Sequence, residues 1–144
     1  MSLGLLLVSI SFNSLLSTER ALSIDIKSME EYKDLKIFFE DIGVENNSNY
    51  DSIQASFLVE DQNGRAFNLK PEKRRYFTRG QITTETAIQV TALRDIYITI
   101  GDQLDDGSWV VNVQINYLIR WIWFSALLMG FAGIILVFSK RAKA

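Results

Sequence analysis

The middle of the chain contains short runs in which apolar and polar residues alternate. Residues 53–59, 96–100 and 109–115 each place an apolar side chain at every second position. A period of two puts these side chains on one face of a β-strand. After the first run, Asn63-Gly64 predicts a type I′ turn, because both residues tolerate positive φ. Weaker alternation occurs in three further runs, 22–27, 35–41 and 82–90.

Short strands at this spacing predict a mainly β fold, a small antiparallel β-barrel or sandwich over residues 19–117. An apolar segment follows it. Residues 121–138 carry no charge, and a helix of that length spans about 27 Å, close to the hydrocarbon thickness of a bilayer. We therefore predict a transmembrane helix over 118–138. The basic tail at 139–144 then places the C-terminus on the cytoplasmic or matrix side.

The first 18 residues are also apolar, and three interpretations are open: a signal peptide, a second membrane segment or a buried core helix. A signal peptide begins with basic residues and ends at a small-residue cleavage site, and the segment has neither. As a helix, Leu3 to Leu16 reaches only about 21 Å. We interpret residues 1–18 as the end of a transmembrane helix, so that the β domain lies outside the membrane between two membrane segments.

The composition narrows the chemistry that the chain can carry out. It has no histidine and no cysteine, which excludes Ser-His-Asp and Cys-His nucleophiles, disulfides, and metal or haem sites that use these ligands. Glu85 and Asp95 are a conceivable carboxylate pair for acid–base chemistry. Exposed strand carboxylates, or an ion pair of Asp95 with Arg94 or Arg79, explain them more simply, so we expect no catalytic residues.

Charge is unevenly distributed along the β domain. Residues 62–79 carry six basic and one acidic side chain, whereas residues 19–61 carry four basic and eleven acidic ones. The basic cluster has three interpretations: solvated residues or partners of nearby carboxylates, a docking surface for a protein or anionic ligand, or a phospholipid contact. Because the domain as a whole is acidic, nucleic acid is not an expected partner. The cluster consists of Arg65, Lys70, Lys73, Arg74, Arg75 and Arg79.

Two further sets of residues are candidates for contacts. Four aromatic residues of the β domain are candidates for docking, although core or rim positions would also explain them: Tyr50, Tyr76, Tyr97 and Trp109. In the C-terminal helix, Ala126, Gly130 and Gly133 form a stripe of small residues at i, i+4 and i+7. Such a stripe allows another membrane helix to approach closely.

Several segments resemble the CcmF family, the large membrane subunit of the cytochrome c maturation haem lyase. The run 69–77, Leu-Lys-Pro-Glu-Lys-Arg-Arg-Tyr-Phe, is similar to a characteristic family segment. Further similar segments follow in the same order as in the family. They include Thr84-Glu85, Arg94-Asp95-Ile96-Tyr97, Ile100-Gly101, Asp106-Gly107-Ser108-Trp109, and the run Arg120-Trp121-Ile122-Trp123 with Leu127-Leu128-Met129-Gly130.

The resemblance implies that the chain corresponds to the C-terminal periplasmic domain and last membrane helix of a larger haem lyase. CcmF proteins transfer haem to the paired thiols of an apocytochrome c, and their haem-handling segments have no counterpart in this sequence. The implied role is structural or docking, with no cofactor bound by this chain alone and haem handled by the parent complex.

The implied partners are the remaining polytopic CcmF-type subunit, accessory subunits of the CcmH and CcmI type, and apocytochrome c. The implied location is the bacterial or mitochondrial inner membrane, with the β domain on the periplasmic or intermembrane-space side. The alternative is a stand-alone, membrane-anchored periplasmic β-domain that acts as an interaction protein or assembly factor.

Overall fold

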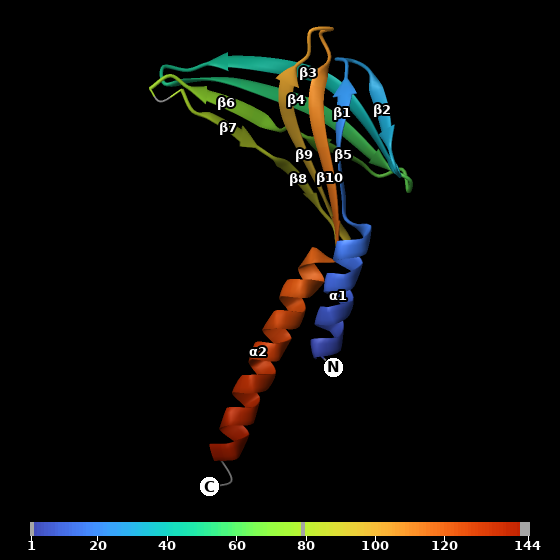
Figure 1. Ribbon diagram of the computed structural model, residues 1–144, viewed down its shortest axis with the longest axis vertical. Coiled ribbons are helices and arrows are strands. Elements are labelled where there is room, and N and C mark those ends of the chain that lie inside the picture. The colour runs from blue at the N-terminus through green and yellow to red at the C-terminus, as the bar shows by residue number, and fades with distance from the viewer. Residues whose placement is uncertain (1, 79, 142–144) are drawn as a thin grey trace. The chain divides into compact units, whose positions relative to one another are not determined.

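The structure is a computed structural model that describes residues 2–78 and 80–141, with side chains up to residue 135. Within these residues, one helix precedes and one follows ten strands in the order of the chain (Figure 1). The elements are α1 (Ser2–Leu16), β1 (Thr18–Ile24), β2 (Met29–Tyr32), β3 (Leu35–Asn46), β4 (Tyr50–Asp61), β5 (Ala66–Leu69), β6 (Glu72–Tyr76), β7 (Ile82–Glu85), β8 (Ala87–Val90), β9 (Arg94–Gln103), β10 (Trp109–Tyr117) and α2 (Ile119–Arg141).

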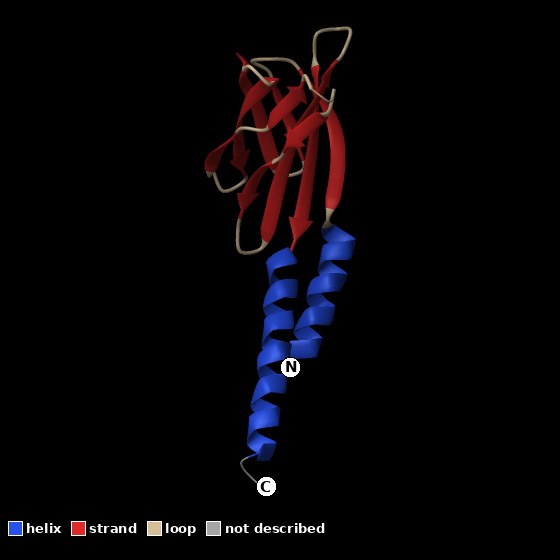
Figure 2. Ribbon diagram, turned by 90° about the vertical axis from the view of Figure 1, so that its left-hand side faces the viewer, coloured by secondary structure: helices blue, strands red, loops and turns tan. Residues whose placement is uncertain are grey.

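The chain divides into two compact units. Figure 2 shows its helices in blue and its strands in red. One comprises Glu19–Gln89 and Ile96–Gln114 and contains most of the strands. The other draws on Met1–Thr18, Val90–Asp95 and Ile115–Ala144 and contains both helices.

The strands form two sheets. The first has the order β1-β10-β9-β8, and the second has six strands in the order β2-β3-β4-β6-β7, with β5 also pairing with β4. The pairs of the second sheet are antiparallel. The prediction of a mainly β fold is confirmed, and of the two predicted architectures the sandwich is the correct one, since the described strands lie in two sheets and not in one closed barrel.

The core lies where the two sheets face each other, and the predicted alternation supplies it. In the six-stranded sheet Phe39 and Phe57 are fully buried, and their rings stack with centroids 4.5 Å apart. The four-stranded sheet contributes the fully buried Ile96 and Ile98 from β9 and Val111 from β10, among others. Every second residue therefore points into the core, as the period of two predicts.

A β-bulge divides β3 into two parts. The pairing register with β4 shifts between Phe39 and Asp41, so that Phe39 lies opposite Phe57 and Val44 lies opposite Ile53. The odd-numbered residues of β3 point inward before the bulge and the even-numbered residues after it. The inner face therefore stays apolar past the bulge as far as Val44, although the numbering of its residues changes parity, and Asn46 is the polar residue at its end.

The turn between β4 and β5 differs from the prediction. Gly64 has a φ of 72°, but Asn63 is not among the residues with positive φ, so the predicted type I′ turn is wrong. Asp61 holds the turn instead: its Oδ1 accepts hydrogen bonds from the backbone N–H groups of Asn63 and Arg65 at 2.8 and 3.1 Å. With only one residue in the left-handed region, the loop is a type I turn followed by glycine.

In the helical unit α1 packs against α2. Ser9 and Ser125 are buried, and each hydroxyl donates to the carbonyl oxygen four residues earlier, at 2.8 and 2.6 Å respectively. Among the side chains described, up to residue 135, we find no helix with the length and apolar character that crossing a membrane requires. The last residues of the predicted span 118–138 and the predicted tail 139–144 lie outside those described side chains.

Candidate docking site

The basic cluster of the sequence is split between the two faces of the six-stranded sheet. On β6, Lys73 lies opposite Ile53 of β4, and Arg75 lies between Asp51 of β4 and Ile82 of β7. Residues opposite each other in a sheet share a face. Lys73 and Arg75 therefore belong to the inner face with Ile53, whereas the side chain between them, Arg74, belongs to the outer face.

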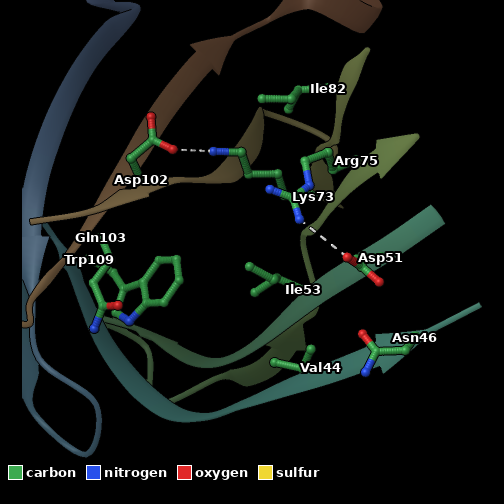
Figure 3. A pocket seen from close by; sticks show the side chains of 10 residues that line it. All are labelled: Val44, Asn46, Asp51, Ile53, Lys73, Arg75, Ile82, Asp102, Gln103 and Trp109. Carbon is green, nitrogen blue, oxygen red and sulfur yellow. Dashed lines mark hydrogen bonds and ion pairs between the residues drawn. The ribbon is translucent and has the colours of Figure 1, made fainter. Parts of the chain in front are cut away.

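The inner pair of cations borders a cavity of about 380 Å³ (Figure 3). It lies beyond the core, at the end of the six-stranded sheet where the bulged part of β3 runs. The six-stranded sheet contributes Val44, Asn46, Asp51, Ile53 and Ile82 besides the two cations, and the other sheet contributes Asp102, Gln103 and Trp109.

Two ion pairs fix the polar part of the cavity. Lys73 donates through Nζ to Asp102 Oδ1 and to the carbonyl oxygen of Gly101, the latter at 3.5 Å. This pair joins β6 of one sheet to β9 of the other. Arg75 donates to Asp51 Oδ2 at 3.3 Å. The Lys73 side chain is only 16 % exposed and the Arg75 side chain 66 %, so Arg75 is the cation that solvent and ligands can reach.

Gly101 leaves little room for a side chain beside the first of these pairs. A Cβ atom at Gly101 would lie 3.1 Å from both Cβ and the carbonyl oxygen of Val110 on β10. These distances are too short for an ordinary side-chain contact. A side chain at Gly101 would therefore make Val110 shift by a few tenths of an ångström, which is unfavourable where β9 and β10 lie close together.

Trp109 forms the boundary between the cavity and the core. Only 9 % of the residue is exposed, and its indole Nε1 is buried with no hydrogen-bond partner among the described residues. An unpaired buried N–H group is unfavourable by about 1–3 kcal/mol. The ring therefore stabilises the sandwich through its apolar surface, part of which lines the cavity.

On the outer face, Arg74 joins carboxylates and aromatic rings. Its guanidinium donates to both oxygens of Glu72 at 2.7 and 2.9 Å and pairs with Glu85 at 2.6 Å. It also lies 5.4 Å from the centroid of the Tyr50 ring, which is itself 5.4 Å from that of Tyr76. The hydrogen bonds with Arg74 lower the pKa of Glu72, and those with Glu72 raise the pKa of Arg74 further above its ordinary value.

The other predicted contact residues do not join these groups. Arg65 and Lys70 are exposed in the segments before and after β5, and Arg79 lies outside the described residues. Tyr97 has the opposite parity to the buried Ile96 and Ile98, so it lies on the outer face of its sheet.

The two carboxylates considered for acid–base chemistry have separate partners. Glu85 pairs with Arg74, and Asp95 lies 3.8 Å from Nε of Arg120, a residue that sequence analysis had not connected with it. No group of three or more metal-ligating side chains occurs in the described part of the chain.

A comparison with models of protein families shows to which family the chain belongs. The model of the family described as the CcmF C-terminal beta-sandwich matches residues 15–116. The chain belongs to this family. The CcmF resemblance drawn from the sequence is thereby confirmed.

Individual relatives agree with this assignment. The cytochrome c-type biogenesis protein CcmF of Pseudomonas aeruginosa is 30 % identical over 94 % of this chain, and that of Escherichia coli is 28 % identical over 99 %. These matches cover 21 % and 22 % of the relatives, so the chain spans about a fifth of their length. A solved structure, the cytochrome c haem lyase CcmF, has the same fold, with a TM-score of 0.69 and 10 % identity over 90 % of this chain and 22 % of that one.

The segments that carry the CcmF resemblance meet at the cavity. Lys73 and Arg75 belong to the run 69–77, and Gly101 and Trp109 belong to two later runs of that resemblance. More than twenty residues separate the run 69–77 from the two later runs, yet in the fold Trp109 lines the same cavity as Lys73 and Arg75, and Gly101 accepts a hydrogen bond from Lys73.

The small-residue stripe of α2 has no partner within the described residues. Apart from the adjoining residues and backbone of the helix itself, no described atom would lie within 4 Å of a Cβ at Gly130 or Gly133, and Ala126 is exposed. The buried small residue of α2 is Ser125, at the next position along the helix from Ala126. The stripe therefore stays a prediction for a helix outside this chain, and Ser125 is a small residue that sequence analysis had not chosen for packing.

Proposed function

We propose that the chain is the C-terminal part of a CcmF-type haem lyase subunit in cytochrome c maturation, the covalent attachment of haem to apocytochrome c. The family match over residues 15–116 is the observation that carries this proposal. The chain corresponds to about a fifth of its relatives, so the lyase activity belongs to the larger assembly and this part has a structural and docking role.

The residue types of the chain support a docking role for this part and assignment of the lyase activity to the larger assembly. Covalent haem attachment requires groups that hold the iron and guide the thiols of the acceptor, and His and Cys are the side chains best suited to both tasks. The chain has neither. Haem is therefore bound by the parent complex, and no catalytic residue is assigned to this chain.

The uncovered cavity supports docking. The inner face of the six-stranded sheet carries exposed apolar and charged side chains around it, which is the composition of a contact surface. The partners that fit the proposal are the remaining polytopic CcmF-type subunit, accessory subunits of the CcmH and CcmI type, and the apocytochrome.

The helical unit supports attachment to a membrane. Most of its large apolar side chains are exposed, among them Leu7, Leu15 and Phe131 at 58 %, 80 % and 62 %. A lipid or protein environment would remove this surface from water. We place both helices in the bacterial or mitochondrial inner membrane, with the sandwich on the periplasmic or intermembrane-space side and the C-terminus on the opposite side.

Deletion and complementation in the native host test the function. In a strain that lacks the gene for this chain, covalently haem-stained c-type cytochromes should disappear and return when the gene is restored. Unchanged staining in the deletion strain would contradict the proposal and favour a stand-alone interaction protein. Protease treatment of sealed membranes tests the topology: digestion of the sandwich from the cytoplasmic side would contradict the orientation.

A further inference from the structure

We infer that the cavity beside Trp109 binds an extended peptide segment that presents a bulky apolar side chain next to a carboxylate. The inference rests on the proposed docking role and specifies the chemistry of the partner. The cavity has a volume of about 380 Å³, which lies at the lower end of the range for ligand sites, about 300–1,000 Å³. A cavity of this size holds one or two side chains and not a folded domain.

The walls select an apolar group. Val44 is 64 % exposed and Ile82 56 %, although both lie on the inner face of the sheet, the face that forms the core elsewhere. Ile53 and Trp109 continue the apolar surface towards the core. A bulky aliphatic or aromatic side chain placed there would remove this surface from water.

On the rim, which also carries Asp51 and Asp102, Arg75 is the exposed cation to which a carboxylate can bind. A guanidinium has five N–H donors, and the described contacts of Arg75 use one of them, on Asp51 at 3.3 Å. Lys73 differs, because it is largely buried and its ammonium group already contacts Asp102 and the Gly101 carbonyl. Arg75 can therefore donate two hydrogen bonds to a second carboxylate, in the two-pronged geometry that arginine favours.

The remaining polar groups suit a peptide backbone. The Asn46 side chain lines the cavity from the end of β3, and a carboxamide can both donate to and accept from a peptide group. Beside it, Ile82 begins β7, an edge strand of the six-stranded sheet. An extended segment at this edge would alternate its side chains between the cavity and solvent.

The test uses the full chain in non-ionic detergent and two fluorescently labelled peptides. One contains Gly-Leu-Phe-Asp-Gly and the other Gly-Leu-Phe-Lys-Gly, with both ends blocked. Fluorescence anisotropy should show that the acidic peptide binds at least about ten-fold more tightly, since a hydrogen-bonded carboxylate at Arg75 is present only in that complex. Equal affinity for the two peptides, or no binding of either, would overturn the inference.

Charge reversal gives the specific control. Arg75→Glu should reverse the preference, so that the lysine peptide binds more tightly, because the mutation replaces the attractive charge by a repulsive one. Arg65→Glu makes the same change on an exposed arginine that does not line the cavity, and it should leave the preference unchanged. If Arg65→Glu had the same effect as Arg75→Glu, the discrimination would arise from overall charge and the inference would be wrong.

A small carboxylate is the competing occupant. If free 3-phenylpropionate bound as tightly as the acidic peptide, the peptide assignment would be overturned. The result is separable from the proposed function. Selective peptide binding in a protein whose deletion leaves haem attachment intact would contradict the lyase role alone, whereas loss of haem attachment without peptide selectivity would contradict this inference alone.

Discussion

The inner face of the six-stranded sheet has a covered half and an open half. In the covered half, before the β3 bulge, Ile37, Phe39 and Phe57 are fully buried. In the open half Val44 and Ile82 are more than half exposed, and charged residues such as Arg75 share the face with them (Figure 3). One continuous sheet thus presents a stabilising core at one end and an accessible surface at the other.

The difference follows from residue chemistry and from what faces each half. Apolar side chains against the second sheet lose their contact with water and stabilise the fold. Beyond the second sheet, inward-pointing charges can stay hydrated and paired, as Arg75 is with Asp51. Mutations in the two halves should therefore have unequal effects on stability.

The largest contrast is expected between Phe57→Ala and Ile53→Ala. Phe57 is fully buried and stacks on Phe39, so its truncation should reduce the free energy of unfolding by about 3–5 kcal/mol. Ile53 lies on the same face of β4 but borders the open cavity. Ile53→Ala should therefore reduce the free energy of unfolding by less than about 2 kcal/mol. Urea unfolding followed by circular dichroism measures both values. Equal losses would show that the open half is packed as tightly as the core.

The next contrast compares two glycines. Gly101→Ala should destabilise the fold by about 1–3 kcal/mol, because the new methyl group would lie 3.1 Å from Val110. Gly43→Ala is the matched change on β3 of the six-stranded sheet, where the nearest atom to a Cβ would be the Gln54 carbonyl oxygen at 3.8 Å. The free energy of unfolding of this variant should stay unchanged or rise by about 0.4–1 kcal/mol, because alanine reduces the conformational entropy of the unfolded chain. Thermal unfolding measures the stability of both variants. An equal loss of stability in Gly43→Ala and Gly101→Ala would contradict the expectation.

A smaller, pH-dependent effect is expected on the outer face of the open half. Hydrogen bonds with Arg74 lower the pKa of Glu72 in the folded state. The ionised Glu72 side chain therefore stabilises the fold above its ordinary pKa of 4.5, and this stabilisation is lost as the pH falls through the pKa of Glu72 in the folded state. Glu72→Gln should therefore be less stable than the wild type at pH 7, with the gap closing in acid.

The control for this pair is Glu45→Gln, which changes an exposed carboxylate. Urea unfolding at neutral and acidic pH should give this variant almost the wild-type profile. A Glu72→Gln deficit that grows as the pH falls would reverse the expected sign and refute the role assigned to Arg74.

Much of the fold was predictable because one face of each long strand is buried. The alternation at 53–59, 96–100 and 109–115 predicted strands and their core residues correctly. The turn at Asn63-Gly64 was not, because the hydrogen bonds of the Asp61 side chain change the geometry that the dipeptide alone would favour. The same competition between side-chain and backbone hydrogen bonding operates in many turns.

The candidate site was only partly predictable. Alternation alone separates Arg74 from Lys73 and Arg75, but the partners of the two inner cations are Asp102 and Asp51, 29 and 24 positions away in the chain. Only the register between strands reveals these pairs, and only the bulge in β3 brings Val44 and Asn46 to the cavity. Sequence analysis found the cations and Trp109 but not the surface that they share.

We propose above all that the open half is the docking site of this CcmF-type module. The direct measurement is the yield of haem-stained c-type cytochromes in the native host when the gene carries Arg75→Glu or Arg65→Glu, with the level of the chain confirmed by immunoblot. We predict a several-fold loss for Arg75→Glu and the wild-type yield for Arg65→Glu. A wild-type yield with Arg75→Glu at an equal level of the chain would contradict the claim.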